Sequence, residues 1–318
     1  MLAGQIVKRA RIELVEVEEP RLASPGEIIF QPEIACLCGS DLPFFDGSHI
    51  EYPLPPGLSL HEMVGTVVET SGERFRAGDR VLAVPLDQTG FFERYALSDE
   101  RAIPLDPRKP PEIAMMAQPL GTAIYALKKL PPLLDLDVVI VGQGPMGQLF
   151  TSAVRNLGAR QIIAVEPVAE RRERSPGRGA TATIDPARED PVAAVARLTG
   201  GAMADVVIEA VGHHEQALAL SIDLCRHKGR ILYFGVPDGN LDDVPWRALF
   251  FKNITVDTSV NPDFTREFPL AMRWICEDRI EVASLQTHRF PVTRIQEAFE
   301  LFRDRREGAQ KVVIDFPR

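Results

Sequence analysis

The chain has few cysteines, no excess of positive charge and no long hydrophobic run. Its four cysteines are too few and too scattered for a disulfide framework. The net charge of −9 disfavours nucleic acids and anionic membranes as partners, because both attract positively charged surfaces. No apolar run approaches the roughly 20 residues that cross a bilayer, and charge enters the N-terminus too early for a signal peptide. We therefore expect a cytoplasmic protein with a small-molecule substrate and with neither nucleic acid nor membrane as partner.

The chain does contain a glycine-rich turn between a strand and a helix. Residues 138–141 form a β-branched run that indicates a buried strand. The next residues predict a tight turn, a close approach of the backbone to a pyrophosphate and the start of a helix. The unpaired N–H groups and the dipole of a helix start attract such an anion. We assign to dinucleotide binding Gly142, Gly144, Pro145, Met146 and Gly147.

Glu166 ends the next apolar run and refines this assignment. Its carboxylate can accept hydrogen bonds from a ribose 2′-OH and would repel a 2′-phosphate, which favours NAD. Arg171 and Arg172 follow closely and keep NADP open as an alternative. We also assign to cofactor binding Val211 and Gly235, at the ends of two later strands.

The segment pattern divides the chain into two parts. The first hundred residues hold short alternating segments separated by turn residues, which predicts a β-rich, barrel-like unit. From residue 137 strands alternate with helices, which predicts an α/β fold with a parallel, doubly wound sheet. A closing β tail should return to the first part. We expect a catalytic domain at 1–122 and 284–318 and a dinucleotide-binding domain at 123–283.

Periodicity and length locate the individual elements. The strands of the parallel sheet are expected at 138–141, 162–165, 182–185, 205–209, 230–235 and 254–256. Helical spacing predicts helices at 112–130, 191–199, 215–226 and 295–303. Pro176 and Gly177 should shorten the helix that follows Glu166.

Cysteine, histidine and acidic residues in the first part indicate a candidate metal site. Cys38, His61 and Glu62 offer a thiolate, an imidazole and a carboxylate, a set that suits zinc. Gln118 offers an amide oxygen near the start of the helix that leaves the β-rich part. Spacing alone does not decide, because a buried cysteine is usually a core residue and a His-Glu pair is usually a solvated or hydrogen-bonded feature.

The motifs resemble, in order and spacing, the medium-chain, zinc-type alcohol dehydrogenase family over nearly the whole chain. The matching motifs are Cys38–Asp41, Leu60–Glu62, Gly78–Val81, Gln118–Leu120, Gly142–Gly147 and Lys311–Ile314. The resemblance implies a GroES-like catalytic domain with zinc and a Rossmann dinucleotide-binding domain. It further implies an enzyme that oxidises a secondary alcohol, polyol or sugar-like substrate with NAD or NADP.

The resemblance also implies a ligand set. Cys38 and His61 would be catalytic zinc ligands, and Glu62 would be a ligand or lie just behind one. Gln118 would be a neutral ligand or the group across a bound water. The four-cysteine lobe that binds a structural zinc in the family is missing after Val84, so one zinc per chain is the ceiling.

Residues beside the ligands would take part in catalysis. Ser40 would touch the substrate oxygen and pass on its proton, and Asp41 would orient the zinc histidine. Leu60 stands where the family usually has glycine, so the backbone there should be less free. Pro43 replaces the relay histidine of some relatives, so the proton must leave through water or the ribose.

The resemblance extends to assembly. Ile254–Val256 is the expected edge strand of a homodimer or homotetramer, as in dimers of the family. His213 and His214, after a sheet strand, are expected at the cofactor edge or in solvent.

Two other functions remain open on the sequence. One is a zinc-free, NADPH-dependent quinone or enoyl reductase of the same fold, which Cys38, His61 and Glu62 speak against because that branch lacks them. The other is a non-catalytic dinucleotide-binding sensor, which the departures from the family pattern favour. The intact Ser40-Asp41 pair argues for retained chemistry.

Overall fold

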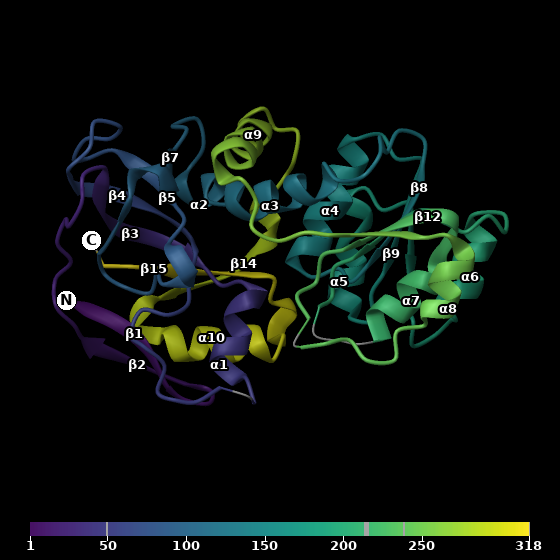
Figure 1. Cartoon of the computed structure of the whole chain (residues 1–318), viewed down its shortest axis with the longest axis horizontal. Helices are drawn as coiled ribbons and strands as arrows, with labels where there is room; N and C mark the ends of the chain where they lie inside the picture. Colours follow the sequence, from purple (N-terminus) through teal and green to yellow (C-terminus); the bar gives the residue numbers. More distant parts are fainter. Residues whose placement is uncertain (49, 213–215, 238, 318) are drawn as a thin grey trace. The chain divides into compact units, whose positions relative to one another are not determined.

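The computed structural model describes residues 1–48, 50–212, 216–237 and 239–317 (Figure 1). The chain forms two compact units, each with its own hydrophobic core. Unit 1 comprises Met1–Gln118, Phe264–Asp278 and Val282–Arg318, and unit 2 comprises Pro119–Asp263 and Arg279–Glu281. The expected domain limits differ from these units at residues 119–122, which fall in unit 2, and at residues 264–278 and 282–283, which fall in unit 1.

Unit 1 is built on a seven-stranded sheet and a separate two-stranded sheet. The larger sheet runs in the order β14-β15-β3-β4-β5-β7 with β6 paired to β3, and β1 pairs with β2. The strands are β1 (Leu2–Lys8), β2 (Arg11–Glu16), β3 (Glu27–Cys36), β4 (Glu62–Thr70), β5 (Arg80–Ala83), β6 (Tyr95–Ser98), β7 (Ala102–Pro104), β14 (Gln286–Pro291) and β15 (Lys311–Asp315). Because β15 pairs with β3, the predicted return of the C-terminal tail is confirmed.

One amphipathic helix closes the core of unit 1. The predicted helix at 295–303 is confirmed as α10 (Ile295–Arg303). Its apolar residues recur at the spacing of one helix face and are all buried: Ile295, Ala298, Phe299 and Phe302. They belong to the same hydrophobic cluster as Phe30 of β3, so this face packs onto the sheet.

The continuous helix predicted over 112–130 is wrong, because the structure divides it. Helix α2 (Pro111–Ala114) ends before Met115, and α3 (Ala117–Leu127) begins two residues later. Pro119 explains the break, since it has no N–H for an internal helical bond but is tolerated in the first turn of a new helix. The division between the units falls within α3, most of which belongs to unit 2, and the other helices of unit 1 are α1 (Leu42–Asp46) and α9 (Phe264–Cys276).

Unit 2 contains the predicted parallel sheet. Its six strands are β8 (Asp137–Val141), β9 (Gln161–Val165), β10 (Ala182–Ile184), β11 (Ala204–Glu209), β12 (Cys225–Tyr233) and β13 (Thr255–Thr258). All neighbours are parallel, in the order β10-β9-β8-β11-β12-β13 (Figure 1). The chain leaves β8 toward one edge of the sheet and returns to place β11 on its other side. Ligands of doubly wound sheets bind at such a reversal, beyond the carboxyl ends of the strands.

The helices of unit 2 lie between these strands in the sequence. They are α4 (Pro145–Asn156), α5 (Ala169–Arg174), α6 (Pro191–Leu198), α7 (Gln216–Leu224) and α8 (Trp246–Lys252). The predicted shortening after Glu166 is confirmed, because α5 stops at Arg174 and a 3-10 turn follows at Pro176–Arg178. Throughout the described ranges, every helix is too short or too polar to traverse a lipid bilayer.

Candidate active site

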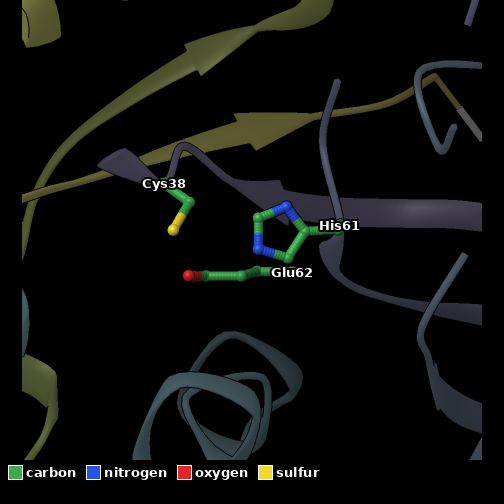
Figure 2. Close-up of side chains that lie close together, drawn as sticks. All are labelled: Cys38, His61 and Glu62. Carbon is green, nitrogen blue, oxygen red and sulfur yellow. The ribbon is translucent and has the colours of Figure 1, made fainter. Parts of the chain in front are cut away.

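The structure brings together Cys38, His61 and Glu62. Cys38 follows β3, and Glu62 begins β4 directly after His61. The two strands are antiparallel with Cys36 opposite Glu62, so the end of β3 lies beside the start of β4. One ligand atom from each of the three side chains lies within 4.8 Å of the others. Figure 2 shows the sulfur, a ring nitrogen and the carboxylate turned toward one another.

This cluster fits zinc. Thiolate, imidazole and carboxylate are the donors that zinc takes, and tetrahedral bonds of about 2.0–2.3 Å place ligand atoms roughly 3.3–3.8 Å apart. Small side-chain shifts therefore bring the three donors to bonding distance from separations of at most 4.8 Å. Cys38 and His61 are half-buried and Glu62 is buried, so the site is sheltered but reachable.

Asp41 connects the loops that carry the ligands. Its fully buried carboxylate accepts hydrogen bonds from the Cys38 N–H at 2.7 Å, the Ser59 hydroxyl at 2.8 Å and the Leu60 N–H at 3.0 Å. The predicted role in orienting His61 stays a prediction, since Asp41 Oδ1 lies 3.9 Å from His61 Nδ1, too far for a hydrogen bond. The contacts that the structure does show hold the backbone on both sides of the cluster.

Leu60 adopts a left-handed backbone conformation, which favours glycine. Its φ is +60°, and that of Ser59 is +106°. For a non-glycine residue this left-handed region costs about 1–2 kcal/mol. The fully buried Leu60 side chain and its N–H bond to Asp41 offset that cost.

Lys311 is the site residue that the sequence analysis missed. It begins β15, and its Nζ donates to both carboxylate oxygens of Glu62. Both side chains are only 1% exposed. The motif Lys311–Ile314 contained a signal, because a lysine next to three apolar residues on a buried strand needs an anion to pair with.

The Glu62–Lys311 pair sets the charge of the cluster. Burial raises the pKa of Glu62, and the ammonium of Lys311 opposes that rise. Burial alone would lower the pKa of Lys311, but the charges of Glu62, Cys38 and Cys36 raise it above its ordinary value. Because both Glu62 oxygens accept from Lys311, we treat the pair as ionised. The ammonium then cancels the carboxylate, and a Cys38 thiolate leaves one negative charge for the metal.

The other predicted site residues of this unit are Ser40 and Gln118, with Cys36 as the expected packing residue. Ser40 is half-buried in the 3-10 turn Gly39–Asp41, two residues after Cys38. Gln118 is buried in the first turn of α3, and its role as a ligand stays a prediction. Cys36 is buried, and burial raises the pKa of its thiol, as expected for a packing residue.

The predicted glycine-rich turn follows β8 in unit 2. Gly142 has a φ of +90°, and a methyl group placed on it would lie 2.9 Å from Val211 Cγ2. Both the dihedral angle and the packing therefore require glycine at this position. Gly144 is the N-cap of α4, Pro145 is its first residue, and Met146 and Gly147 continue it. The unpaired N–H groups at the start of this 12-residue helix therefore lie at the glycine-rich turn, beyond the carboxyl end of β8.

Glu166 and Arg171 lie beside this turn. Glu166 is 4% exposed and accepts hydrogen bonds from the Gln143 N–H at 2.6 Å and the Val168 N–H at 2.9 Å. A methyl group placed on Gly144 would lie 3.6 Å from Arg171 Nη1. The carboxylate thus ties the end of β9 to the glycine-rich turn, and a guanidinium lies next to the turn.

Val211 and Gly235 follow β11 and β12 at the same edge of the sheet. Val211 is 37% exposed, and Gly235 is half-buried. Their N–H groups both donate to Glu209, at 2.8 and 3.0 Å. The expectation for His213 and His214 falls outside the described residues.

Known proteins match both units. The family model "Alcohol dehydrogenase GroES-like domain" matches residues 24–103, and "Zinc-binding dehydrogenase" matches residues 145–277. The chain is similar to L-threonine 3-dehydrogenase of Pyrococcus abyssi, with 27% identity over 93% of each chain. It is also similar to two solved structures at 25% identity. These are an alcohol dehydrogenase from Thermus sp. ATN1 (TM-score 0.88, all of both chains) and 2R,3R-butanediol dehydrogenase from Bacillus subtilis (TM-score 0.84, 100% of this chain and 99% of that one).

These matches agree with the geometry of both units. The matched segments contain the cluster of Cys38, His61 and Glu62 and, from Pro145 on, the helix α4 that follows the glycine-rich turn. The chain therefore belongs to the zinc-type medium-chain dehydrogenase/reductase family, as an alcohol dehydrogenase-type oxidoreductase with a GroES-like domain and a Rossmann-type domain.

Proposed function

We propose that the chain transfers a hydride between a secondary alcohol, polyol or sugar-like substrate and a nicotinamide cofactor, at one catalytic zinc. The observation that carries this proposal is the convergence of Cys38, His61 and Glu62 within 4.8 Å. Two relatives are named for L-threonine and 2R,3R-butanediol, and both compounds are secondary alcohols. They are the first substrates to test.

In the proposed site the chain's own residues hold the metal. Cys38 and His61 would be ligands, and Glu62 would be a ligand or lie just behind one while it pairs with Lys311. Gln118 is the neutral ligand or the group across a bound water. When bound, zinc supplies a Lewis acid that lowers the pKa of an alcohol hydroxyl, and nicotinamide accepts a hydride.

Two further residues complete the proposed machinery. Ser40 Oγ accepts the proton of the substrate hydroxyl and releases it to water or the ribose, since Pro43 cannot relay it. Asp41 keeps the Cys38 and Leu60 backbones in place through the hydrogen bonds described above. Because these loops are already held in place, the site does not have to rearrange when substrate binds.

We propose NAD as the preferred cofactor, held by the glycine-rich turn, Glu166, Arg171, Val211 and Gly235. The buried negative charge of Glu166 opposes a 2′-phosphate at the end of β9. Titration with NADH and NADPH, followed by nicotinamide fluorescence, tests the preference. Tighter binding of NADPH, lost in Arg171→Ala, would reverse it and assign the phosphate to that guanidinium.

Zinc content is the first test of the catalytic proposal. Protein purified without added metal or chelator should hold close to one zinc per chain and oxidise a secondary alcohol. Cys38→Ser should lose both the zinc and the activity. Cys36→Ser is the matched control, because Cys36 lies two residues away and is not part of the cluster, so it should keep the zinc.

The other outcomes separate the alternatives. Absence of zinc that soaking does not restore would reject the catalytic proposal. Reduction of a quinone with NADPH, unchanged in Cys38→Ser, would then identify the reductase. Cofactor binding without turnover of either substrate class would identify the sensor.

We also propose a homodimer or homotetramer in which β13 pairs with its copy in a second chain. β13 is the last strand of the sheet, so one of its edges is free to pair, and Val256 on it is 37% exposed. The preceding α8 exposes Trp246, Phe250 and Phe251 at 60–66%. Light scattering should give two or four chains, and Val256→Lys, which places a charge on this edge strand, should lower that number. A monomeric wild type would reject this assembly.

A further inference from the structure

A second buried glutamate, Glu209, lies at the carboxyl end of the parallel sheet. It is the last residue of β11, its exposed fraction is 0%, and within the described residues no cation pairs with it. Its Oε1 accepts from the N–H groups of Val211 at 2.8 Å and Gly212 at 3.1 Å. Its Oε2 accepts from the N–H of Gly235 at 3.0 Å, in the loop after the neighbouring strand β12.

The arrangement repeats that of Glu166 on the other side of β8. Glu166 directly follows β9 and Glu209 ends β11, and each accepts from the N–H two residues further on, Val168 for Glu166 and Val211 for Glu209. The second oxygen of each then reaches the loop after an adjacent strand, at Gln143 or Gly235. The two carboxylates therefore fix the loops on both sides of the point where the strand order reverses.

The loops held by Glu209 also pack on each other and on the glycine-rich turn. A methyl group on Gly235 would clash with the backbone of Gly212 and lie 2.6 Å from Glu209 Oε2. Val211 Cγ2 already reaches the Gly142 side of the turn. A displacement of the Glu209 carboxylate would therefore displace the glycine-rich turn as well, and the N–H groups of that turn form the proposed pyrophosphate site.

We propose that Glu209 is a positioning residue for the nicotinamide cofactor, acting through the loops 210–212 and 234–236. The inference rests on the proposed function, because it requires that a nicotinamide cofactor binds at this edge. The loops present two exposed apolar side chains, Val211 at 37% and Val236 at 54%, which a planar aromatic ring can cover. Among the described residues, backbone N–H groups are the partners of this buried carboxylate, so the loops that supply them are fixed before the cofactor arrives.

The variant Glu209→Gln tests the proposal. The amide keeps the size of the side chain, but its NH₂ group must face at least one N–H that Glu209 accepts, so at least one of the bonds is lost. We expect the Kd for NADH, or for NADPH if the wild type prefers it, to rise about tenfold, which is ~1.4 kcal/mol. In steady state the KM for the cofactor should rise more than kcat falls.

Asp137→Asn is the matched control. Asp137 begins β8 at the opposite edge of the same sheet, is 1% exposed and pairs with Arg160 at 2.6 Å. Its replacement should lower the melting temperature as Glu209→Gln does but leave the cofactor Kd unchanged. Equal Kd values for both variants and the wild type would overturn the positioning role and leave the proposed function intact. A wild type that binds neither NADH nor NADPH would overturn both.

Hydrogen exchange on the wild type tests the same proposal without a variant. If Glu209 fixes the loops in advance, the amides of Val211, Gly212 and Gly235 exchange slowly in the absence of cofactor. Fast exchange that slows only after cofactor is added would show that the cofactor orders the loops, and the proposal would be rejected. This measurement decides the question even if Glu209→Gln fails to fold.

Discussion

The two units stabilise buried carboxylates in different ways. In unit 1, Glu62 faces the ammonium of Lys311, 249 residues away in the sequence. In unit 2, Glu166 and Glu209 accept hydrogen bonds from backbone N–H groups of their own and adjacent loops. Both arrangements compensate the buried negative charge, but they restrict the movement of the carboxylate to different degrees.

An ammonium and a set of amides do not constrain a carboxylate equally. Each carboxylate oxygen can accept more than one bond, so Glu62 can contact Lys311 and still offer an electron pair to a metal. The glutamates of unit 2 are committed to loops that would move with them. The comparison shows that Glu62, at the proposed metal site, is balanced by a charge, whereas Glu166 and Glu209, at the proposed cofactor loops, are balanced by hydrogen bonds from those loops.

Breaking the ion pair should have the largest effect. Lys311→Met keeps most of the side-chain length but leaves the Glu62 charge buried without compensation. Removal of one partner of a buried pair costs about 3–5 kcal/mol. Urea unfolding of the metal-free protein, followed by circular dichroism, measures the loss.

A second substitution checks the origin of that loss. The double variant Lys311→Met with Glu62→Gln removes the unpaired charge and should recover most of the stability. If Lys311→Met alone is as stable as the wild type, the ammonium does not balance the charge of Glu62. The difference described between the two units would then be wrong for unit 1.

Asp41 should show a smaller effect, because it is held in the manner of unit 2 although it lies in unit 1. Asp41→Asn places an NH₂ group against one of three donors and should cost about 1–3 kcal/mol. It should also weaken zinc binding, measured against a competing chelator, since the Cys38 backbone loses its anchor. Ser59→Ala removes a single donor and leaves both backbone bonds. A zinc affinity as low in Ser59→Ala as in Asp41→Asn would contradict the role of the Cys38 N–H bond.

The strands and the glycine-rich turn were predictable because their signals are local. A β-branched run, Gly142 with its positive φ and the helix start at Pro145 all lie within eight residues of one another. The break between α2 and α3 was equally local, and Pro119 gave the signal for it. The sequence analysis gave helical periodicity over 112–130 more weight than that proline.

The partners of the site residues were not predictable in the same way. Lys311 meets Glu62 only because β15 pairs with β3, and β3 with β4, in one particular register. Glu209 lies in a strand that the sequence located, but its partner Gly235 follows another strand. No periodicity within either segment specifies such a contact. The ligand motifs could be found from the sequence. The groups that balance the charge of these residues or hold their loops could be found only from the three-dimensional structure.

Two substitutions at Leu60 have the smallest expected difference in stability. They separate the cost of backbone strain from the loss of side-chain burial. Leu60→Ala should cost about 2–4 kcal/mol through the lost buried side chain. At an ordinary helix or strand position Gly is less stable than Ala by roughly 0.5–1 kcal/mol. At a φ of +60° the order should reverse, and Leu60→Gly should be more stable than Leu60→Ala by about 1 kcal/mol. Urea midpoints of the two variants decide this. The ordinary order, with Ala the more stable, would mean that the Asp41 bond does not hold Leu60 in the left-handed region in solution.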